Sequence, residues 1–133
     1  MITYALEPDL TSGEFRAVLV ASTLAQRRPA DDPARLEKML RNADVIITAR
    51  ENGRLIGVSR AITDFSYCCY LSDLAVDAGY QRRGIGKRLI AETHAAAGEG
   101  TTLLLVAAPA AEGYYPRIGL QHVSSCWSIP RSK

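Results

Sequence analysis

Apolar and polar positions divide the chain into two kinds of segment, separated by short turn-forming stretches. In the first kind, apolar residues alternate with polar ones or form unbroken β-branched runs, and both patterns predict β-strands. The expected strands are Ile2–Leu6, Val45–Arg50, Leu55–Thr63, Tyr67–Val76, Thr101–Ala107 and His122–Ile129. Asn52-Gly53 favours a type I′ hairpin turn, so we expect an antiparallel meander in the middle of the chain.

In the second kind of segment, apolar residues recur with helical spacing and residues that start or end helices lie at the borders. The clearest example runs from about Ile85 to Ala97 and ends at Gly98. Pro116 limits a short helix that carries Tyr114 and Tyr115 to a turn or two. The other expected helix starts are Thr11 or Ser12 before Gly13, Asp31 or Asp32 before Pro33, and Pro109.

Together these segments predict the order β-α-α-β-β-β-α-β-α-β, which is an α/β fold. The nearly all-apolar strand Thr101–Ala107 is typical of a buried strand beside a parallel neighbour. We therefore expect a mixed central sheet with helices on both faces. The 133 residues suit one domain with its own core, covering positions 1–133.

Composition and charge exclude several classes of protein. The net charge of +2 is too small to indicate nucleic-acid binding by itself. No apolar run approaches the length of a membrane span and no signal peptide opens the chain, so we expect a cytoplasmic protein that binds no membrane. Cys68, Cys69 and Cys126 lack CxxC spacing, so neither a metal site nor a disulfide framework is predicted.

One stretch, from Leu74 to Ile90, carries the strongest chemical signal. A strand ends at Val76, and a run of glycines and cations then opens a helix. The first turn of a helix has free N–H groups and the positive end of the helix dipole, and glycines allow close approach by a phosphate. The cations around this turn are Arg82, Arg83, Lys87 and Arg88. The pattern therefore predicts an anion site.

The run differs from the two common nucleotide-binding loops. Arg88 follows Lys87, which departs from GxxxxGK[ST], and Leu89 fills the last position of GxGxxG. The order of strand, Gln-x-x-Gly-x-Gly and helix resembles the GNAT family of acyl-CoA-dependent N-acyltransferases. The residues that carry this resemblance are Gln81-Arg82-Arg83-Gly84-Ile85-Gly86, preceded by Leu74-Ala75-Val76.

A second stretch near the C-terminus is also similar to that family. Many members carry an aromatic-Tyr pair, three residues, and then Gly with an apolar residue, which here reads Tyr114-Tyr115-Pro116-Arg117-Ile118-Gly119-Leu120. Two positions depart from the family pattern. Ala108 stands where many members have Asn, and Tyr70 stands where some members place a Glu base.

The resemblance implies a donor, acetyl-CoA, as an acyl-donor cosubstrate. A basic helix N-terminus suits the phosphates of coenzyme A, and an amide chain such as pantetheine can pair with a strand edge. The implied donor-binding residues are Leu74, Ala75, Val76, Gln81, Arg82, Arg83, Gly84, Ile85, Gly86, Lys87 and Arg88. The implied reaction transfers the acetyl group to a primary amine, that of a small molecule, by direct attack in a ternary complex. A homodimer through the C-terminal strands is implied by the resemblance alone.

Two residues are candidates for catalysis. Tyr115 matches the position of the family's general acid, which protonates the leaving thiolate. Asp73 is the carboxylate nearest the expected thioester end of the cleft, where it is either a general base or a structural polar group. Other polar residues on or beside the central strands are Asp64, Tyr67 and Tyr70.

Three alternative functions stay open. A non-catalytic acyl-CoA-binding or regulatory module would keep the glycine turn. A protein acetyltransferase would use a lysine or N-terminal amine as acceptor. A nucleic-acid-binding protein would use the cations Arg27, Arg28, Arg82, Arg83, Lys87 and Arg88, although no RNA or DNA motif is present.

Overall fold

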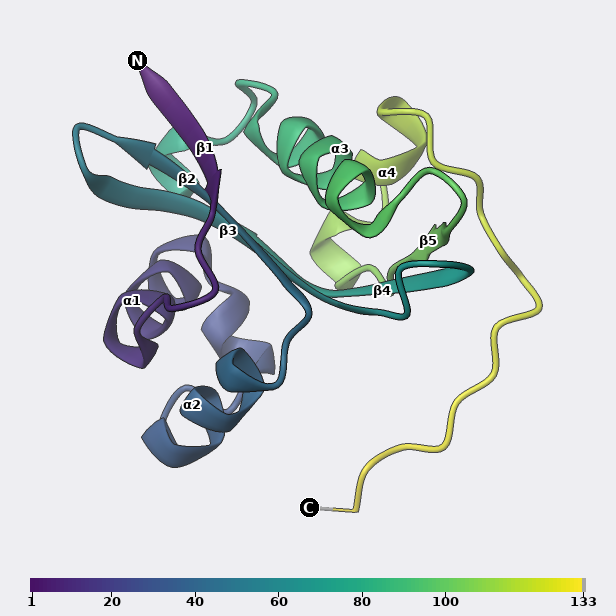
Figure 1. The fold of residues 1–133 in the computed structure, drawn as a ribbon, viewed down its shortest axis with the longest axis horizontal. Coiled ribbons are helices and arrows are strands. Elements are labelled where there is room, and N and C mark those ends of the chain that lie inside the picture. Colours follow the sequence, from purple (N-terminus) through teal and green to yellow (C-terminus); the bar gives the residue numbers. More distant parts are fainter. Residues whose placement is uncertain (133) are drawn as a thin grey trace.

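The computed structural model describes residues 1–132, in which five strands form one mixed sheet with helices on both faces (Figure 1). The strands are β1 (Ile2–Leu6), β2 (Val45–Glu51), β3 (Arg54–Thr63), β4 (Cys68–Val76) and β5 (Thr102–Leu104). They lie side by side in the order β1-β2-β3-β4-β5. Strands β1 to β4 pair antiparallel, and β5 pairs parallel with β4, so the mixed sheet is confirmed.

The helices sort onto the two faces as the sequence predicts. Helices α1 and α2 cover one face of the sheet, and α3 and α4 lie on the other side (Figure 1). Their bounds are α1 (Ser12–Ser22), α2 (Pro33–Arg41), α3 (Ile85–Ala97) and α4 (Tyr114–Arg117), with 3₁₀ turns η1 (Leu24–Arg27), η2 (Ala78–Tyr80) and η3 (Pro109–Ala111). No helix among residues 1–132 is both long enough and apolar enough to cross a membrane.

Local capping residues explain where the first elements begin. The Thr11 hydroxyl accepts a hydrogen bond from the Glu14 amide at 3.2 Å and starts α1. Asp32 accepts from the Arg35 amide at 3.1 Å and starts α2, as predicted. Asn52 and Gly53 both have positive φ, 51° and 81°, which is the backbone that a type I′ turn between β2 and β3 requires.

Each face of the sheet has its own apolar core. On the α3 side, the buried residues include Ile47, Ile56, Leu71, Ile85 and Leu89. On the α1 and α2 side, they include Phe15, Leu19, Leu36, Leu40, Val58 and Ala75. Neighbouring residues of β4 point to opposite faces of the sheet. This strand therefore contributes side chains to both cores.

The predicted last strand, His122–Ile129, is wrong. No strand follows α4 among residues 118–132, and Trp127 and Ile129 are 90% and 98% exposed. A strand needs a neighbour for its backbone N–H and C=O groups. No backbone hydrogen bond joins residues 121–132 to the sheet, so the alternating pattern alone produces an extended segment.

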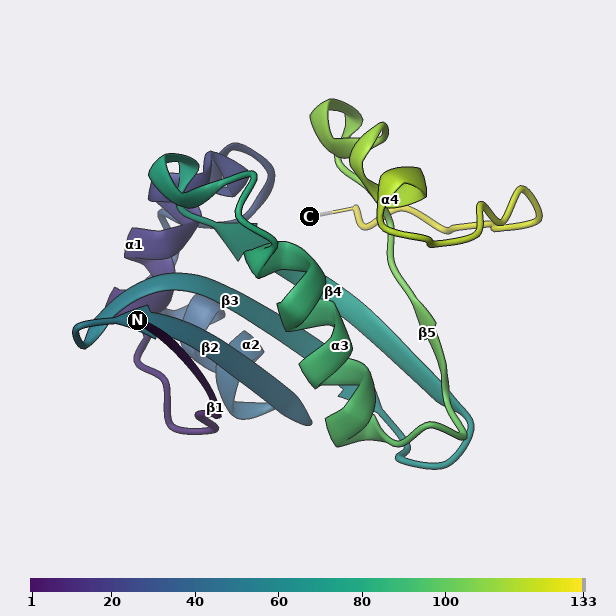
Figure 2. The same ribbon diagram turned by 90° about the horizontal axis from the view of Figure 1, so that it is seen from above.

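Strand β5 is shorter than the predicted Thr101–Ala107, and this shortening shapes the sheet. It pairs with β4 at three positions only, which end at Tyr70 opposite Leu104. Beyond that pair the chain leaves β4 and runs towards α4 (Figure 2). The edge of β4 from Leu71 to Val76 therefore has no strand beside it in the described structure.

A bulge lies where this open edge begins. Arg60 of β3 is opposite Asp73, whereas Ala61, the next residue, is opposite Leu71. Ser72 is thus the extra residue of β4 at this point, which bends the strand locally.

Candidate active site

The glycine turn before α3 adopts a backbone that only its glycine accepts without strain. Gly84 is the N-cap of α3 with φ of 79°, in the left-handed region. The first bond of the helix runs from the Arg88 amide to the Gly84 carbonyl at 3.0 Å. The amides of the preceding first-turn residues therefore lack partners within the helix, which is the geometry of an anion site.

Polar contacts to β2 and β3 hold the loop that leads into this turn. Asp77 accepts from the Gly79 amide at 2.8 Å and pairs with Arg54 at 3.0 Å. The Tyr80 hydroxyl donates to Glu51 at 2.7 Å. These contacts fix the loop before any ligand binds, so little backbone ordering is required on binding.

The four predicted cations of the turn differ in what they contact. The side chains of Arg82 and Lys87 make no hydrogen bond or ion pair within residues 1–132. The Arg83 guanidinium lies 5.0 Å from the centre of the Tyr80 ring. Arg88 instead lies over the Tyr4 ring at 4.5 Å and pairs with Glu92. Three cations are therefore available beside the turn, and Arg88 is directed to the flank of α3.

Gly86, the second glycine of the motif, lies directly against a neighbouring side chain. A Cβ at this position would lie 2.6 Å from the Tyr114 hydroxyl and 3.3 Å from the ring carbon that bears it. Burial raises the pKa of the Tyr114 phenol, and a hydrogen bond from the Lys87 backbone partly offsets this shift. Tyr114 thus packs onto the first turn of α3 and joins α4 to the glycine turn.

The open edge of β4 holds the other predicted donor-binding residues. Leu74 and Val76 are partly buried against the α3 core, and Ala75 is buried in the core on the opposite face. The Val76 carbonyl already accepts from the Gln81 side chain at 3.3 Å. The amides and carbonyls along this edge are the groups that an extended amide chain would pair with.

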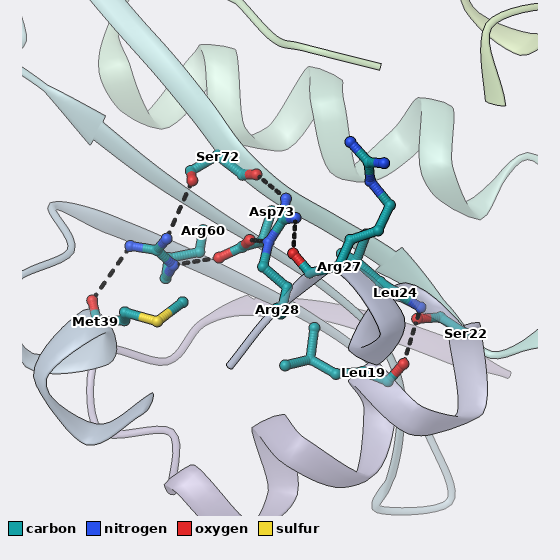
Figure 3. A network of polar contacts seen from close by, with 9 residues as sticks. All are labelled: Leu19, Ser22, Leu24, Arg27, Arg28, Met39, Arg60, Ser72 and Asp73. Carbon is teal, nitrogen blue, oxygen red and sulfur yellow. Dashed lines mark hydrogen bonds and ion pairs between the residues drawn. The ribbon is translucent and has the colours of Figure 1, made fainter. Parts of the chain in front are cut away.

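Asp73 is fully buried and forms ion pairs with two arginines (Figure 3). The Nε groups of Arg28 and Arg60 each donate to a different oxygen of its carboxylate. Arg28 also donates to the Ser72 carbonyl at 2.8 Å, and Arg60 donates to the Ser72 hydroxyl at 3.1 Å. A buried charge is stable only when it is paired in this way. The network holds the bulge of β4 and joins it to the loop after η1.

Asp64 has a structural task of its own. Its carboxylate accepts from the amides of Tyr67, Ser66 and Cys68 at 2.8, 2.9 and 3.1 Å. These hydrogen bonds lower the pKa of Asp64 to about 2. Asp64 therefore caps the turn between β3 and β4.

A family model described as the acetyltransferase (GNAT) family matches residues 13–120. The chain belongs to the GNAT family of acetyltransferases. The matched range contains the glycine turn, the bulge of β4 and the tyrosine pair of α4.

Solved structures of GNAT proteins have the same fold. A GNAT family acetyltransferase from Streptococcus pneumoniae is 22% identical, with a TM-score of 0.79 over 100% of this chain and 98% of that one. The aminoglycoside N-acetyltransferase AAC(6')-Iy in complex with CoA is 17% identical, with a TM-score of 0.76 over 100% of this chain and 96% of that one. At these identities the likeness concerns the fold.

Two curated acetyltransferase sequences of Glycine max are similar over a short stretch. The histone acetyltransferase TAP1 of Glycine max is 48% identical over 40 residues, which are 30% of this chain. The matched part spans only 17% of that longer protein.

The tyrosine pair of this GNAT chain differs from simple helical geometry. Its rings contact each other edge to face, with centres 5.2 Å apart, although adjacent residues of a helix diverge by about 100°. The hydroxyl of Tyr115 makes no hydrogen bond within the described chain. Burial and the neighbouring Tyr114 both raise the pKa of Tyr115, burial more strongly. It is therefore a protonated phenol whose hydroxyl is not used by the fold.

Sequence reasoning did not connect Arg28 and Arg60 with Asp73. Arg28 lies 45 positions from Asp73 and Arg60 lies 13 positions away, so no local spacing connects them. The one available signal was a carboxylate within a strand that packs on both faces, because such a group needs a cationic partner.

Proposed function

We propose that this GNAT chain, as a single domain over residues 1–133, transfers the acetyl group of acetyl-CoA to the primary amine of a small molecule. The observation that carries the proposal is the combination of an open β4 edge with a preformed anion turn at the end of the same strand. An amide chain and a pyrophosphate are joined in coenzyme A, and the two features would bind them in that order. The CoA complex of the GNAT enzyme AAC(6')-Iy supports this choice of donor.

The donor would be held by three groups of residues. The anion turn contributes Gly84, Ile85 and Gly86 through backbone amides, and Arg82, Arg83 and Lys87 through charge. Gln81 would position the loop between β4 and α3, because its side-chain amide donates a hydrogen bond to the Val76 carbonyl. Leu74, Ala75 and Val76 line the open edge. We leave Arg88 out of this set because its guanidinium lies on Tyr4 and Glu92.

The chemistry proposed is direct attack within a ternary complex. The neutral amine nitrogen attacks the thioester carbonyl carbon and forms the new C–N bond. The tetrahedral intermediate then breaks its C–S bond, the nitrogen loses a proton to water, and the sulfur takes a proton. Tyr115 would supply this last proton and recover it from solvent.

For Asp73 we propose a positioning role rather than that of a base. Both of its oxygens are bonded to guanidinium groups, and the side chain has no exposed surface. The carboxylate would hold Ser72 and the bulge in place at the start of the open edge. Deprotonation of the amine would then occur through water, so the acid limb of the pH–rate profile would follow the pKa of the amine.

An acceptor screen tests the proposal. Purified protein, acetyl-CoA and a panel of small primary amines are combined, and the released thiol of coenzyme A is measured. We expect turnover above the background hydrolysis for at least one class of amine. The proposal is wrong if coenzyme A binds but no amine and no peptide lysine or N-terminus is acetylated. That result would instead support a non-catalytic acyl-CoA-binding module.

Tyr115→Phe tests the assignment of the acid. We expect the maximal rate to fall by about tenfold to a thousandfold with little change in acetyl-CoA affinity. Because burial raises its pKa, Tyr115 stays protonated to above pH 10, so the wild-type rate should not fall with its ionisation below that pH. A wild-type rate in the variant would mean that water or substrate supplies the proton.

A protein acetyltransferase is the second candidate. The observation in its favour is the 40-residue match to TAP1, which is named a histone acetyltransferase. Faster acetylation of a lysine peptide than of any free amine would favour it. The homodimer stays a prediction, and sedimentation would test it.

A further inference from the structure

The network around Asp73 contains more positive than negative charge. Arg28 and Arg60 both pair with this one carboxylate, which is the only acid within ion-pair distance of either among residues 1–132. The other partners of the two guanidinium groups are neutral oxygens of Ser72, Arg27 and Met39. The network therefore carries one unpaired positive charge beside the bulge.

Arg28 is the member of the network that a ligand can reach. Its side chain is 23% exposed, whereas that of Arg60 is 9% exposed. A guanidinium has five N–H donors. Arg28 uses three of its nitrogen atoms for one bond each, to Asp73, Arg27 and Ser72, which leaves N–H capacity on both terminal nitrogens.

A second arginine adjoins this position without any partner. Arg27 is exposed, and its side chain makes no hydrogen bond or ion pair in the described chain. Figure 3 shows this side chain extending away from the network, while its backbone carbonyl is bonded to Arg28. Arg27, the last residue of η1, and Arg28, which follows it, therefore offer two adjacent cations, one anchored and one without a side-chain partner.

The two arginines lie near the end of the open β4 edge where the acceptor would approach. Arg28 is bonded to the Ser72 carbonyl, at the bulge where the open edge of β4 begins. In the proposed ternary complex the acceptor amine must approach the thioester at this edge from the side not occupied by the donor. A group attached to the amine would then lie beside Arg28.

We propose that the acceptor carries a carboxylate near its amine, as an amino acid does, and that Arg28 and Arg27 bind this carboxylate. The inference rests on the proposed function. A carboxylate would pair with the unpaired charge and accept bidentate hydrogen bonds from a guanidinium. A polyamine would place further positive charge beside the two arginines and would be disfavoured.

Matched ligand pairs test the proposal. Amino acids, their carboxamides and diamines of similar length are titrated into the protein saturated with coenzyme A, and their dissociation constants are measured by NMR or calorimetry. The dead-end complex makes this readout independent of turnover. We expect at least one amino acid to bind about tenfold or more tightly than its own carboxamide, the ratio expected for a lost charge-assisted contact.

Variants then assign the preference to the arginines. Arg27→Ala should reduce the ratio between acid and carboxamide to below about threefold, because Arg27 contributes to no contact of the fold through its side chain. Arg28→Lys should reduce it while keeping a positive charge beside Asp73, since an ammonium cannot form the bidentate contact. Arg131→Ala, which removes an exposed arginine of the C-terminal segment, serves as the matched control and should leave the ratio unchanged.

The outcomes separate this inference from the proposed function. Two results would overturn the carboxylate site. In the first, carboxamides or diamines bind as well as every amino acid. In the second, Arg27→Ala and Arg28→Lys leave the affinity ratio between acid and carboxamide unchanged. A preserved acid preference without any thiol release would support the site and contradict acetyl transfer. Thiol release with diamines alone would support acetyl transfer and overturn the carboxylate site.

Discussion

Two clusters of arginines lie at the opposite ends of the open edge of β4, and they are built in different ways. The glycine turn collects its cations from nearby positions of the chain, and the side chains of Arg82 and Lys87 have no partner in the described structure. The bulge network joins Arg28, Arg60 and Asp73 from three distant segments and is largely buried. The cations of the first cluster are available to a ligand, whereas most of the charge in the second cluster is paired within the fold.

The two arrangements leave different amounts of charge available for a ligand. Exposed cations around a helix N-terminus repel one another, and a bound anion relieves this repulsion and stabilises the site. Buried guanidinium groups on one carboxylate stabilise the structure through mutual pairing, and only their excess charge is left for a ligand. The two clusters should therefore respond differently to substitution.

The largest effect is expected from Asp73→Asn. Removing the carboxylate leaves two guanidinium groups buried or half-buried without a counter-charge, which should lower the free energy of unfolding by about 3–5 kcal/mol. Urea or thermal unfolding measures this. Asp31→Asn is the matched control, because Asp31 pairs with Arg16 at 3.6 Å with a fully exposed side chain, and it should leave the free energy of unfolding nearly unchanged. Equal stability of the two variants would contradict the structural role of Asp73.

The next effect concerns the glycine turn and should appear in binding. Gly84→Glu places a bulky anion at the site proposed for the pyrophosphate and should weaken coenzyme A binding by on the order of a hundredfold or more. Gly84→Ala is its control, since both variants carry the strain of a φ of 79°, about 1–2 kcal/mol. Calorimetric titration separates charge from strain. Similar affinities for the two variants would exclude this turn as the anion site.

A smaller contrast separates two cations of the same turn. Arg83→Ala should weaken coenzyme A binding by about 1–3 kcal/mol, the usual cost of losing a charge-assisted bond. Arg88→Ala should change it by less than about 0.5 kcal/mol, since this side chain is directed to Tyr4 and Glu92. The same calorimetric experiment compares them, and a reversed order would mean that Arg88 turns towards the ligand.

The smallest effect tests the contact between the glycine turn and α4. Gly86→Ala introduces a Cβ within 2.6 Å of the Tyr114 hydroxyl, so packing must shift at a cost of about 1–2 kcal/mol. Tyr114→Phe removes that hydroxyl and should restore part of the stability in the double variant, although the ring carbon stays at 3.3 Å. Additive losses in thermal unfolding would show that the two residues do not couple.

The same contrast explains what could be predicted from the sequence. The glycine turn, helix α3 and the caps Thr11 and Asp32 depend on neighbouring residues, so local spacing sufficed to predict them. The missing strand at His122–Ile129 depends on whether another strand edge is within reach, which no local pattern records. The pairing of Asp73 with Arg28 likewise depends on how the sheet and the loop after η1 pack.

The outward direction of Arg88 shows a further limit. On a helix, adjacent residues diverge by about 100°, so four cations in one run cannot all face the same ligand. The sequence placed Lys87 and Arg88 in a single site, but Glu92 and Tyr4 provide partners for Arg88 on another face. We therefore expect Arg88 to contribute less than Lys87 to the proposed anion site.

A two-step NMR titration tests most directly the claim that the donor and acceptor occupy the two ends of the open edge. Coenzyme A is added first to ¹⁵N-labelled protein, and an amino acid that binds this complex is added second. We predict that the first addition shifts the backbone amides of residues 81–87 and the β4 edge, and that the second shifts the side chain of Arg28 and the amide of Ser72. A response to coenzyme A that leaves the amides of residues 81–87 unchanged would contradict the account.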